Sequence, residues 1–174
     1  MISSHYWLVL VCLGASACGP WAGYKPGPGD SGYGTGPTGL GSSSSSAATT
    51  ADHDFCLSET NRYRAIANLA PLVISPTLQT FADAGATADN ASQTPHGHFL
   101  SANGAALGYA ENEIPWVPYP SSGTVQQIIS RGLAGMWAEG AQGADFVNLV
   151  GPFLQMGCGI AIGNGRITIV QDFN

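Results

Sequence analysis

The last third of the chain contains acidic and imidazole side chains whose types suit a polar cleft or a metal site. Glu111 lies in the stretch AENEIPW and Glu139 in MWAEG, an aspartate opens DFVNLVGPF, and a His-Gly-His sequence lies just upstream. Carboxylates and imidazoles from separated segments are common donors to a bound cation. We therefore predict a site formed from these segments, with the candidate ligands His96, His98, Glu111, Glu139 and Asp145.

The composition argues against a nucleic-acid partner. The chain has 174 residues, which is enough for one domain, and its 5 basic and 11 acidic residues give a net charge of -6. A protein that binds a phosphate backbone needs a basic patch, and the basic residues here are Lys25 and scattered arginines. The same deficit argues against charge-driven binding to anionic membranes.

The N-terminus predicts export. An apolar run from Trp7 to Leu13 is too short to span a bilayer and leads into small residues at 14–17, which is typical of a signal peptide. Because Cys18 follows directly, as in a bacterial lipobox, we expect residues 1–18 to end in a lipidated cysteine. The first residues lack Lys and Arg, which leaves ordinary secretion as the alternative. Either way we expect an extracytoplasmic protein, held at a membrane by its lipid anchor alone.

The cysteines agree with an oxidising compartment. Removal of the signal segment takes Cys12, and lipidation uses Cys18, which leaves Cys56 and Cys158. An even pair in an exported protein predicts a disulfide. That bond would close a loop of about 100 residues, worth roughly 4–5 kcal/mol in the chain-entropy model. Two buried free thiols are the alternative.

The chain divides into a tether and a folded segment. Residues 19–50 are rich in Gly, Pro, Ser and Thr and contain almost no aliphatic residues. Such a segment cannot bury enough apolar surface to offset its ordering entropy, so we predict a flexible tether. Its Gly-Asp-Ser-Gly sequence at 29–32 matches the nucleophile motif of trypsin-like proteases, but no strands surround it. We expect one folded domain over 51–174.

The first half of the folded segment predicts two helices. Asp52 or Asp54 can cap the first. Ser75 can cap the second, with Pro76 in its first position. The many alanines of this second helix and its Gly85 predict close packing against a neighbouring element.

The second half predicts a loop, a third helix and a β-hairpin. Residues 115–123 contain three prolines and predict the loop, and a helical period of apolar residues predicts a helix over 124–138. Apolar residues alternate on both sides of the Gly-Asn-Gly turn at 163–165, which predicts the hairpin. Helices that precede and separate the strands indicate a sheet covered by helices.

Six short motifs, in their order, resemble the CAP superfamily of cysteine-rich secretory proteins, venom allergens, plant pathogenesis-related proteins and bacterial relatives. The resemblance covers about 55–173. Its motifs are ETNRYR at 59–64, AENE at 110–113, WAE at 137–139, DFVNL at 145–149, GCG at 157–159 and VQDF at 170–173. It implies an α/β (α+β) fold, a three-layer α-β-α sandwich with a central, mainly antiparallel sheet.

The resemblance also implies a cleft that holds two histidines and two acids. Carried over by position, the acids are Glu111 and Glu139, and the first histidine is His96 or His98. Side chains at i and i+2 point opposite ways in an extended chain, so we expect one of the two histidines to enter the cleft. Asp145 stands where the family has its second histidine.

This exchange changes the cation that the site would prefer. Two imidazoles and two carboxylates suit Zn²⁺, whereas one imidazole and three carboxylates shift the preference toward Mg²⁺, Ca²⁺ or Mn²⁺. Three acids that converge without a cation should also raise the pKa of at least one carboxyl. The expected site therefore either holds a divalent cation (Zn²⁺, Mg²⁺, Ca²⁺ or Mn²⁺) or stays partly protonated without one.

The same residues have structural explanations. Asp145 can cap a short helix at 146–149, Glu139 can be an exposed helix end, and Glu111 can accept backbone hydrogen bonds. We expect the two asparagines at 112 and 148 to tie loops to the backbone, and Glu113 to be solvated.

We expect a monomeric, non-enzymatic binding module, because the resemblance implies binding to a lipid, glycan or protein and no general catalytic activity. A hydrolase that uses Glu111 and Glu139, with or without a metal, is the second hypothesis. Neither a Gly-x-Ser-x-Gly elbow nor a phosphate loop accompanies these acids. A structural or adhesive envelope protein with a vestigial cleft is the third hypothesis.

Overall fold

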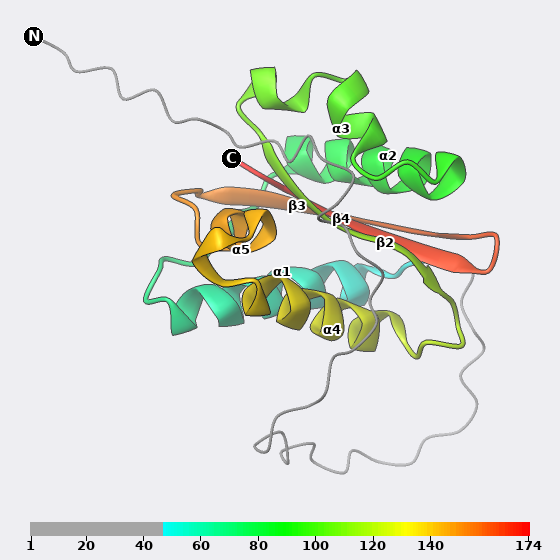
Figure 1. Ribbon diagram of the computed structural model, residues 1–174, viewed down its shortest axis with the longest axis horizontal. Helices are drawn as coiled ribbons and strands as arrows, with labels where there is room; N and C mark the ends of the chain where they lie inside the picture. Colours follow the sequence, from blue (N-terminus) through cyan, green and yellow to red (C-terminus); the bar gives the residue numbers. More distant parts are fainter. Residues whose placement is uncertain (1–46) are drawn as a thin grey trace, which may run out of the picture.

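The structure, a computed structural model, describes residues 47–174 (Figure 1). The predicted signal segment, Cys18 and nearly all of the predicted tether lie outside these residues, so the division of the chain stays a prediction. Within the described part no helix is long and apolar enough to cross a membrane. The elements are α1 (Thr50–Ile66), β1 (Val73–Ile74), α2 (Pro76–Ser92), α3 (Gly97–Ser101), η1 (Gly104–Leu107), β2 (Ala110–Pro118), α4 (Val125–Ala138), η2 (Gly140–Gln142), α5 (Ala144–Leu149), β3 (Gln155–Gly163) and β4 (Arg166–Phe173).

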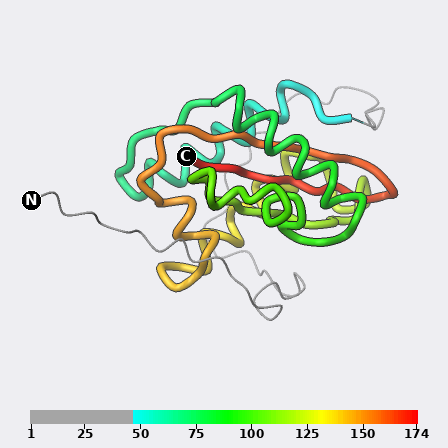
Figure 2. Tube along the Cα trace, turned by 90° about the horizontal axis from the view of Figure 1, so that it is seen from above, coloured from blue at the N-terminus to red at the C-terminus, as the bar shows by residue number. Residues whose placement is uncertain are grey.

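The strands form one mixed sheet with helices on both faces. Their order is β1-β3-β4-β2, so β2 is an edge strand. β1 pairs parallel with β3, while β3 with β4 and β2 with β4 pair antiparallel. α2 and α3 cover one face, and α1, α4 and α5 cover the other (Figure 1). From above, α2 follows the direction of β3 and β4 (Figure 2). The expected α/β class and three-layer sandwich are confirmed.

Local capping chemistry fixes the helix starts. At α1 the Thr49 hydroxyl accepts from the Asp52 amide at 3.3 Å, and the Asp52 carboxylate accepts from the Thr49 amide at 2.9 Å. The prediction that Asp52 or Asp54 is the capping residue is therefore wrong, because Asp52 is the third-position partner of a Thr49 cap. Ser75 caps α2 with Pro76 in the first position, as predicted.

The larger hydrophobic core lies between the sheet and the pair α1 and α4. Odd-numbered residues of β4 point into it, and the apolar stripe of α4 meets them as the helical period predicts. Its fully buried members include Ile114, Ile128, Ile129, Leu133, Ile167, Ile169 and Phe173.

On the opposite face α2 lies directly on β3. A Cβ at Gly159 would overlap the carbonyl group of Ala82, and a Cβ at Gly157 would overlap the backbone of Leu78. The two glycines therefore set the separation between helix and strand, because any side chain there would push α2 outward. The predicted close packing of α2 is confirmed.

Strand β2 corrects the sequence analysis. Residues 115–118 were expected in a loop, but β2 continues to Pro118 and pairs with β4. A register shift between Ile114 and Val117 accommodates Pro115. Proline is tolerated here because an edge strand leaves one row of amides unpaired. The consequence for function is that Glu111 and Glu113 belong to a strand and share one of its faces.

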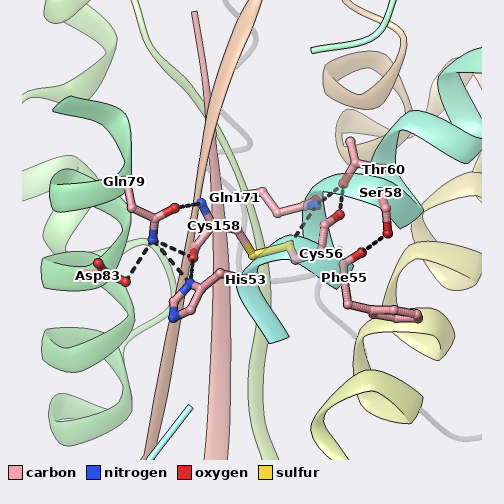
Figure 3. Close-up of a disulfide and its surroundings, with 9 residues drawn as sticks. All are labelled: His53, Phe55, Cys56, Ser58, Thr60, Gln79, Asp83, Cys158 and Gln171. Carbon is pink, nitrogen blue, oxygen red and sulfur yellow. Dashed lines mark hydrogen bonds between the residues drawn. A yellow bond between two sulfur atoms is a disulfide. The ribbon is translucent and has the colours of Figure 1, made fainter. Parts of the chain in front are cut away.

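A disulfide joins Cys56 of α1 to Cys158 of β3, as predicted (Figure 3). The backbone of Cys158 also forms hydrogen bonds with Gln79 of α2 and His53 of α1. Gln79 donates to the Cys158 carbonyl at 2.8 Å and accepts from the Cys158 amide at 3.1 Å, and His53 Nδ1 lies 2.7 Å from the same carbonyl oxygen. This single strand position therefore links both helical layers to the sheet.

Arg64 fastens the chain segment that leads from α5 into β3. Its side chain is buried and donates to the carbonyls of Ala70, Leu149, Gly151 and Phe153 at 2.9 to 3.2 Å. Burial lowers the pKa of this guanidinium. These bonds fix where α5 ends, and so help to place α5 against the edge strand.

We predict that the Cys56→Ala, Cys158→Ala double variant unfolds more easily than the native chain. The bond closes a loop with a sequence separation of 102 residues. The chain-entropy model then gives a loss of about 4–5 kcal/mol in the free energy of unfolding, measured by urea denaturation. A reductant should destabilise the native chain and leave the double variant unchanged. A loss below about 1 kcal/mol would show that the bond adds little to the fold.

Candidate functional site

Buried acids gather between the sheet and the pair α2 and α3. Glu111 and Glu113 point from β2 toward these helices, and Asp172 of β4 is the register partner of Glu111. All three are buried, Asp172 completely. Asp89 of α2 is buried nearby, and its Oδ1 accepts from the His98 amide at 2.8 Å. The layer under α2 thus contains four carboxyl groups.

His96 bridges two of these acids. It precedes α3 in a left-handed conformation, with φ of 55°. Its Nδ1 lies 2.8 Å from Glu111 Oε1 and 3.9 Å from Glu113 Oε2, and its backbone amide donates to Glu113 Oε2 at 2.6 Å. In the described part of the chain, His96, Glu111 and Glu113 are the group whose potential ligand atoms lie within 4.8 Å of one another.

His98 lies on the same side of the sheet but is oriented differently. Its Nδ1 is buried and has no hydrogen-bond partner among residues 47–174. A Cβ built on Gly85 would lie 3.5 Å from this nitrogen and 3.7 Å from Glu111 Oε2. Both histidines are therefore close to Glu111. His96 reaches it directly, and His98 lies beneath α2.

Glu139 and Asp145 form a second group on the other side of β2. Glu139 is an exposed residue at the end of α4, and its Oε2 accepts from the Asp145 amide at 3.2 Å. Asp145 lies in the first turn of α5, where Gly143 is the capping residue and no side-chain cap bond forms. The suggestion that Asp145 caps this helix is therefore wrong. The structure brings His96 to Glu111 and Glu139 to Asp145.

Asparagines tie the two groups to the edge strand. Asn148 of α5 donates to the Glu111 carbonyl at 3.1 Å and to Asn112 Oδ1 at 2.9 Å. Asn112 in turn donates to the Asp145 carbonyl at 3.0 Å. As expected from the sequence, both amides act on the backbone. They hold α5 against β2, so that the two acidic groups flank the same edge.

Burial is the main cause of the raised carboxyl pKa values in the first group, which comprises Glu111, Glu113 and Asp172. Desolvation raises the pKa of Glu113 to about 8, against the hydrogen bond and charge of His96. Desolvation also raises the pKa of Glu111 and of Asp172, and the charges of neighbouring acids add to the effect. Two ionised carboxylates have no donor between them, so a hydrogen bond joins Glu111 and Asp172 when one of them is protonated.

The second group is perturbed in the same direction. Desolvation and then the charge of Glu139 raise the pKa of Asp145 to about 7, while the charge of His96 lowers it. The sequence analysis expected a raised carboxyl pKa from repulsion among converging acids, whereas burial is the larger cause here and the charge of a neighbouring acid comes second.

Several buried carboxyl oxygens in this layer have no hydrogen-bond partner among the described residues. Among residues 47–174 the unpartnered carboxyl atoms are Asp89 Oδ2, Glu111 Oε2, Glu113 Oε1 and both oxygens of Asp172. A buried polar group without a partner costs free energy, and protons or a cation would each relieve that cost. The layer can therefore store protons or bind a positive ion.

Sequence reasoning missed three of the four acids in this layer. Glu113 was expected to be solvated, which is wrong, because its side chain is 1% exposed. The spacing of two between Glu111 and Glu113 would place both side chains on one face of a strand. The sequence analysis did not use this spacing, because it did not predict a strand here. Asp172 and Asp89 become visible only when the register of β2 with β4 and the position of α2 are known.

Among known proteins, the sequence model of the cysteine-rich secretory protein (CAP) family matches residues 57–173, which is more than half of the chain. No curated protein matches the chain.

We predict that, with a chelator present, the free energy of unfolding falls as the pH rises from about 5 to about 8. The buried carboxyls keep protons to higher pH in the folded chain, with a pKa of about 8 for Glu113, while unfolded carboxyls lose them near pH 4. The folded state therefore binds more protons across this window, and the slope is negative, by at most about 1.4 kcal/mol per pH unit for each group.

Urea denaturation at several pH values measures this slope. Asp172→Asn should make it shallower, because an amide of the same shape cannot ionise. Asp54→Asn, on the exposed surface of α1, is the matched control and should leave the slope unchanged. A stability that rises over the same pH range would contradict the raised pKa values.

Proposed function

Because the chain belongs to the cysteine-rich secretory protein (CAP) family, we propose that it is an extracytoplasmic binding module whose acid-rich cleft holds a divalent cation. The observation that carries the cation is the convergence of His96, Glu111 and Glu113, with ligand atoms within 4.8 Å of one another. The Cys56–Cys158 disulfide supports an oxidising compartment. A lipid anchor on Cys18 and a lipid, glycan or protein ligand complete this proposal.

The donor set favours a hard cation. One imidazole and two carboxylates offer mostly oxygen, which suits Mn²⁺, Mg²⁺ or Ca²⁺ better than an all-nitrogen or sulfur site would. Glu111 Oε2 and Glu113 Oε1 are unpartnered, so each carboxylate has a second oxygen free for coordination. A bound cation would supply the positive charge that the four buried acids lack, and would favour their ionised forms.

Glu113 is a candidate cation ligand that the CAP resemblance did not indicate. The resemblance indicated Glu139, and it indicated Asp145 because the family has a histidine at that position. In this chain those two acids contact each other, while Glu113 lies beside His96. We propose that Glu113 takes over a place in the cation site and that Glu139 and Asp145 contribute negative potential from across the strand edge.

We predict that a divalent cation raises the melting temperature of the full chain. If the cation is present at about 100 times its dissociation constant, it stabilises the folded state by about 2.7 kcal/mol, which raises the melting temperature by roughly 10 °C for a domain of this size. Differential scanning fluorimetry with Mn²⁺, Mg²⁺, Ca²⁺ and Zn²⁺ measures the shift. Glu111→Gln or Glu113→Gln should abolish it, because each removes a charged ligand.

Glu139→Gln and Asp145→Asn serve as matched controls and should keep most of the shift. Loss of the shift in the two controls, with the shift retained in Glu113→Gln, would assign the cation to the family positions instead. Absence of binding heat for all four cations would refute the cation site.

A further inference from the structure

A groove runs along one flank of α2, beside α3 and η1. Residues between positions 76 and 84 of α2, together with His98, Leu107 and Tyr109, line a volume of about 630 Å³. This is within the usual range for small-molecule sites, roughly 300–1,000 Å³. Leu107 on the rim is 55% exposed. The groove adjoins the buried acids but does not belong to the proposed cation site.

Three aromatic rings give the groove a specific shape. The ring of Phe81 meets that of His98 at 4.7 Å between centroids, with an angle of 61° between the planes. Phe81 meets Tyr109 at 5.3 Å and 76°. Both partner rings stand steeply to the ring of Phe81, and we call these three rings, which all line the groove, the aromatic box. Rings in this arrangement can direct their electron-rich faces toward one bound group.

Acidic side chains lie close to the groove, since the space over Gly85 is bordered by His98 Nδ1 and Glu111 Oε2. Among residues 47–174, no arginine or lysine lines the groove. Arg62 and Arg64 of α1 lie across the sheet, and so does Arg131 of α4 (Figure 1). Arg166 begins β4, at the end of that strand opposite Asp172. Within this part of the chain, an anionic ligand would find no arginine or lysine partner in the groove.

We propose that this groove binds a small quaternary ammonium compound the size of choline, free in solution, with its methylated cation between Phe81, Tyr109 and His98. Aromatic faces attract a cation within about 6 Å of the ring centroid. A methylated ammonium loses less hydration than a primary one, and its methyl groups match the apolar walls. A positive charge bound there would also favour the ionised forms of the nearby acids.

The rim of the groove fits the other end of such a molecule. Thr77 and Thr80 place hydroxyl groups beside the aromatic box. Thr80 Oγ1 donates to the Pro76 carbonyl at 3.0 Å, so its lone pairs remain as acceptors for an alcohol group. A compound with a cation at one end and a hydroxyl at the other can thus satisfy both parts of the groove.

Calorimetric titration of the full chain with choline tests the proposal. EDTA is present throughout, so the outcome does not depend on the cation site proposed above. We expect millimolar binding of choline, and binding at least about tenfold weaker for 3,3-dimethyl-1-butanol, which has the same shape without the charge. Phe81→Leu and Tyr109→Leu should each weaken choline binding about five- to tenfold, while Phe153→Leu, on another ring, should not.

A pair of surface variants keeps the test valid if the aromatic variants fail to fold. Leu107→Lys places a positive charge on the rim and should weaken choline binding, whereas Leu100→Lys, on an equally exposed leucine outside the lining, should not. Equal affinity for choline and its neutral analogue would overturn the proposal. So would no binding of choline, or binding of phosphatidylcholine vesicles without binding of free choline.

Discussion

The close approach of α2 to β3 is the constraint on which the acidic layer depends. Gly157 and Gly159 leave no side chain between the helix and the strand, so the layer under α2 is thin. Ala82 and Gly85, which are buried small residues of α2, keep the layer thin further along the helix. Short carboxylates fit in the remaining space. No lysine or arginine side chain of the described residues enters it to neutralise them, so the acids stay buried and incompletely paired.

The two faces of the sheet consequently have different roles. The face under α1 and α4 holds the large apolar core, the disulfide and the carbonyl bonds of Arg64, which together supply stability. The face under α2 and α3 has a small apolar cluster and a polar layer. Groups that would destabilise a core, such as Glu111 and Asp172, can be retained there because the opposite face offsets their cost. Stability and binding chemistry thus occupy opposite sides of one sheet.

Much of the fold could be predicted, because it follows from local patterns. The Ser75-Pro76 helix start, the apolar period of α4 and the alternation around 163–165 all appear in the structure as elements. β2 was missed because Pro115 reads as a loop residue, and only its edge position with a register shift makes that proline compatible with a strand.

The site was predicted in part. Glu111 was proposed by motif position together with either His96 or His98, and His96 contacts it. Glu113 and Asp172 were missed because the direction of a side chain depends on strand register, which the sequence does not state locally. The pairing of Glu139 with Asp145 was missed for a related reason, since it depends on how the turn through η2 returns the chain toward the end of α4.

At both edges of the sheet, side-chain amides form hydrogen bonds with backbone groups of the outer strands. Gln79 uses both of its polar atoms on Cys158, beyond the point where β1 ends, and Asn148 bonds the outer carbonyl of Glu111 in β2. An incoming strand from another molecule would have to displace these amides before it could extend the ladder. Two ordinary polar residues therefore protect the open edges from aggregation.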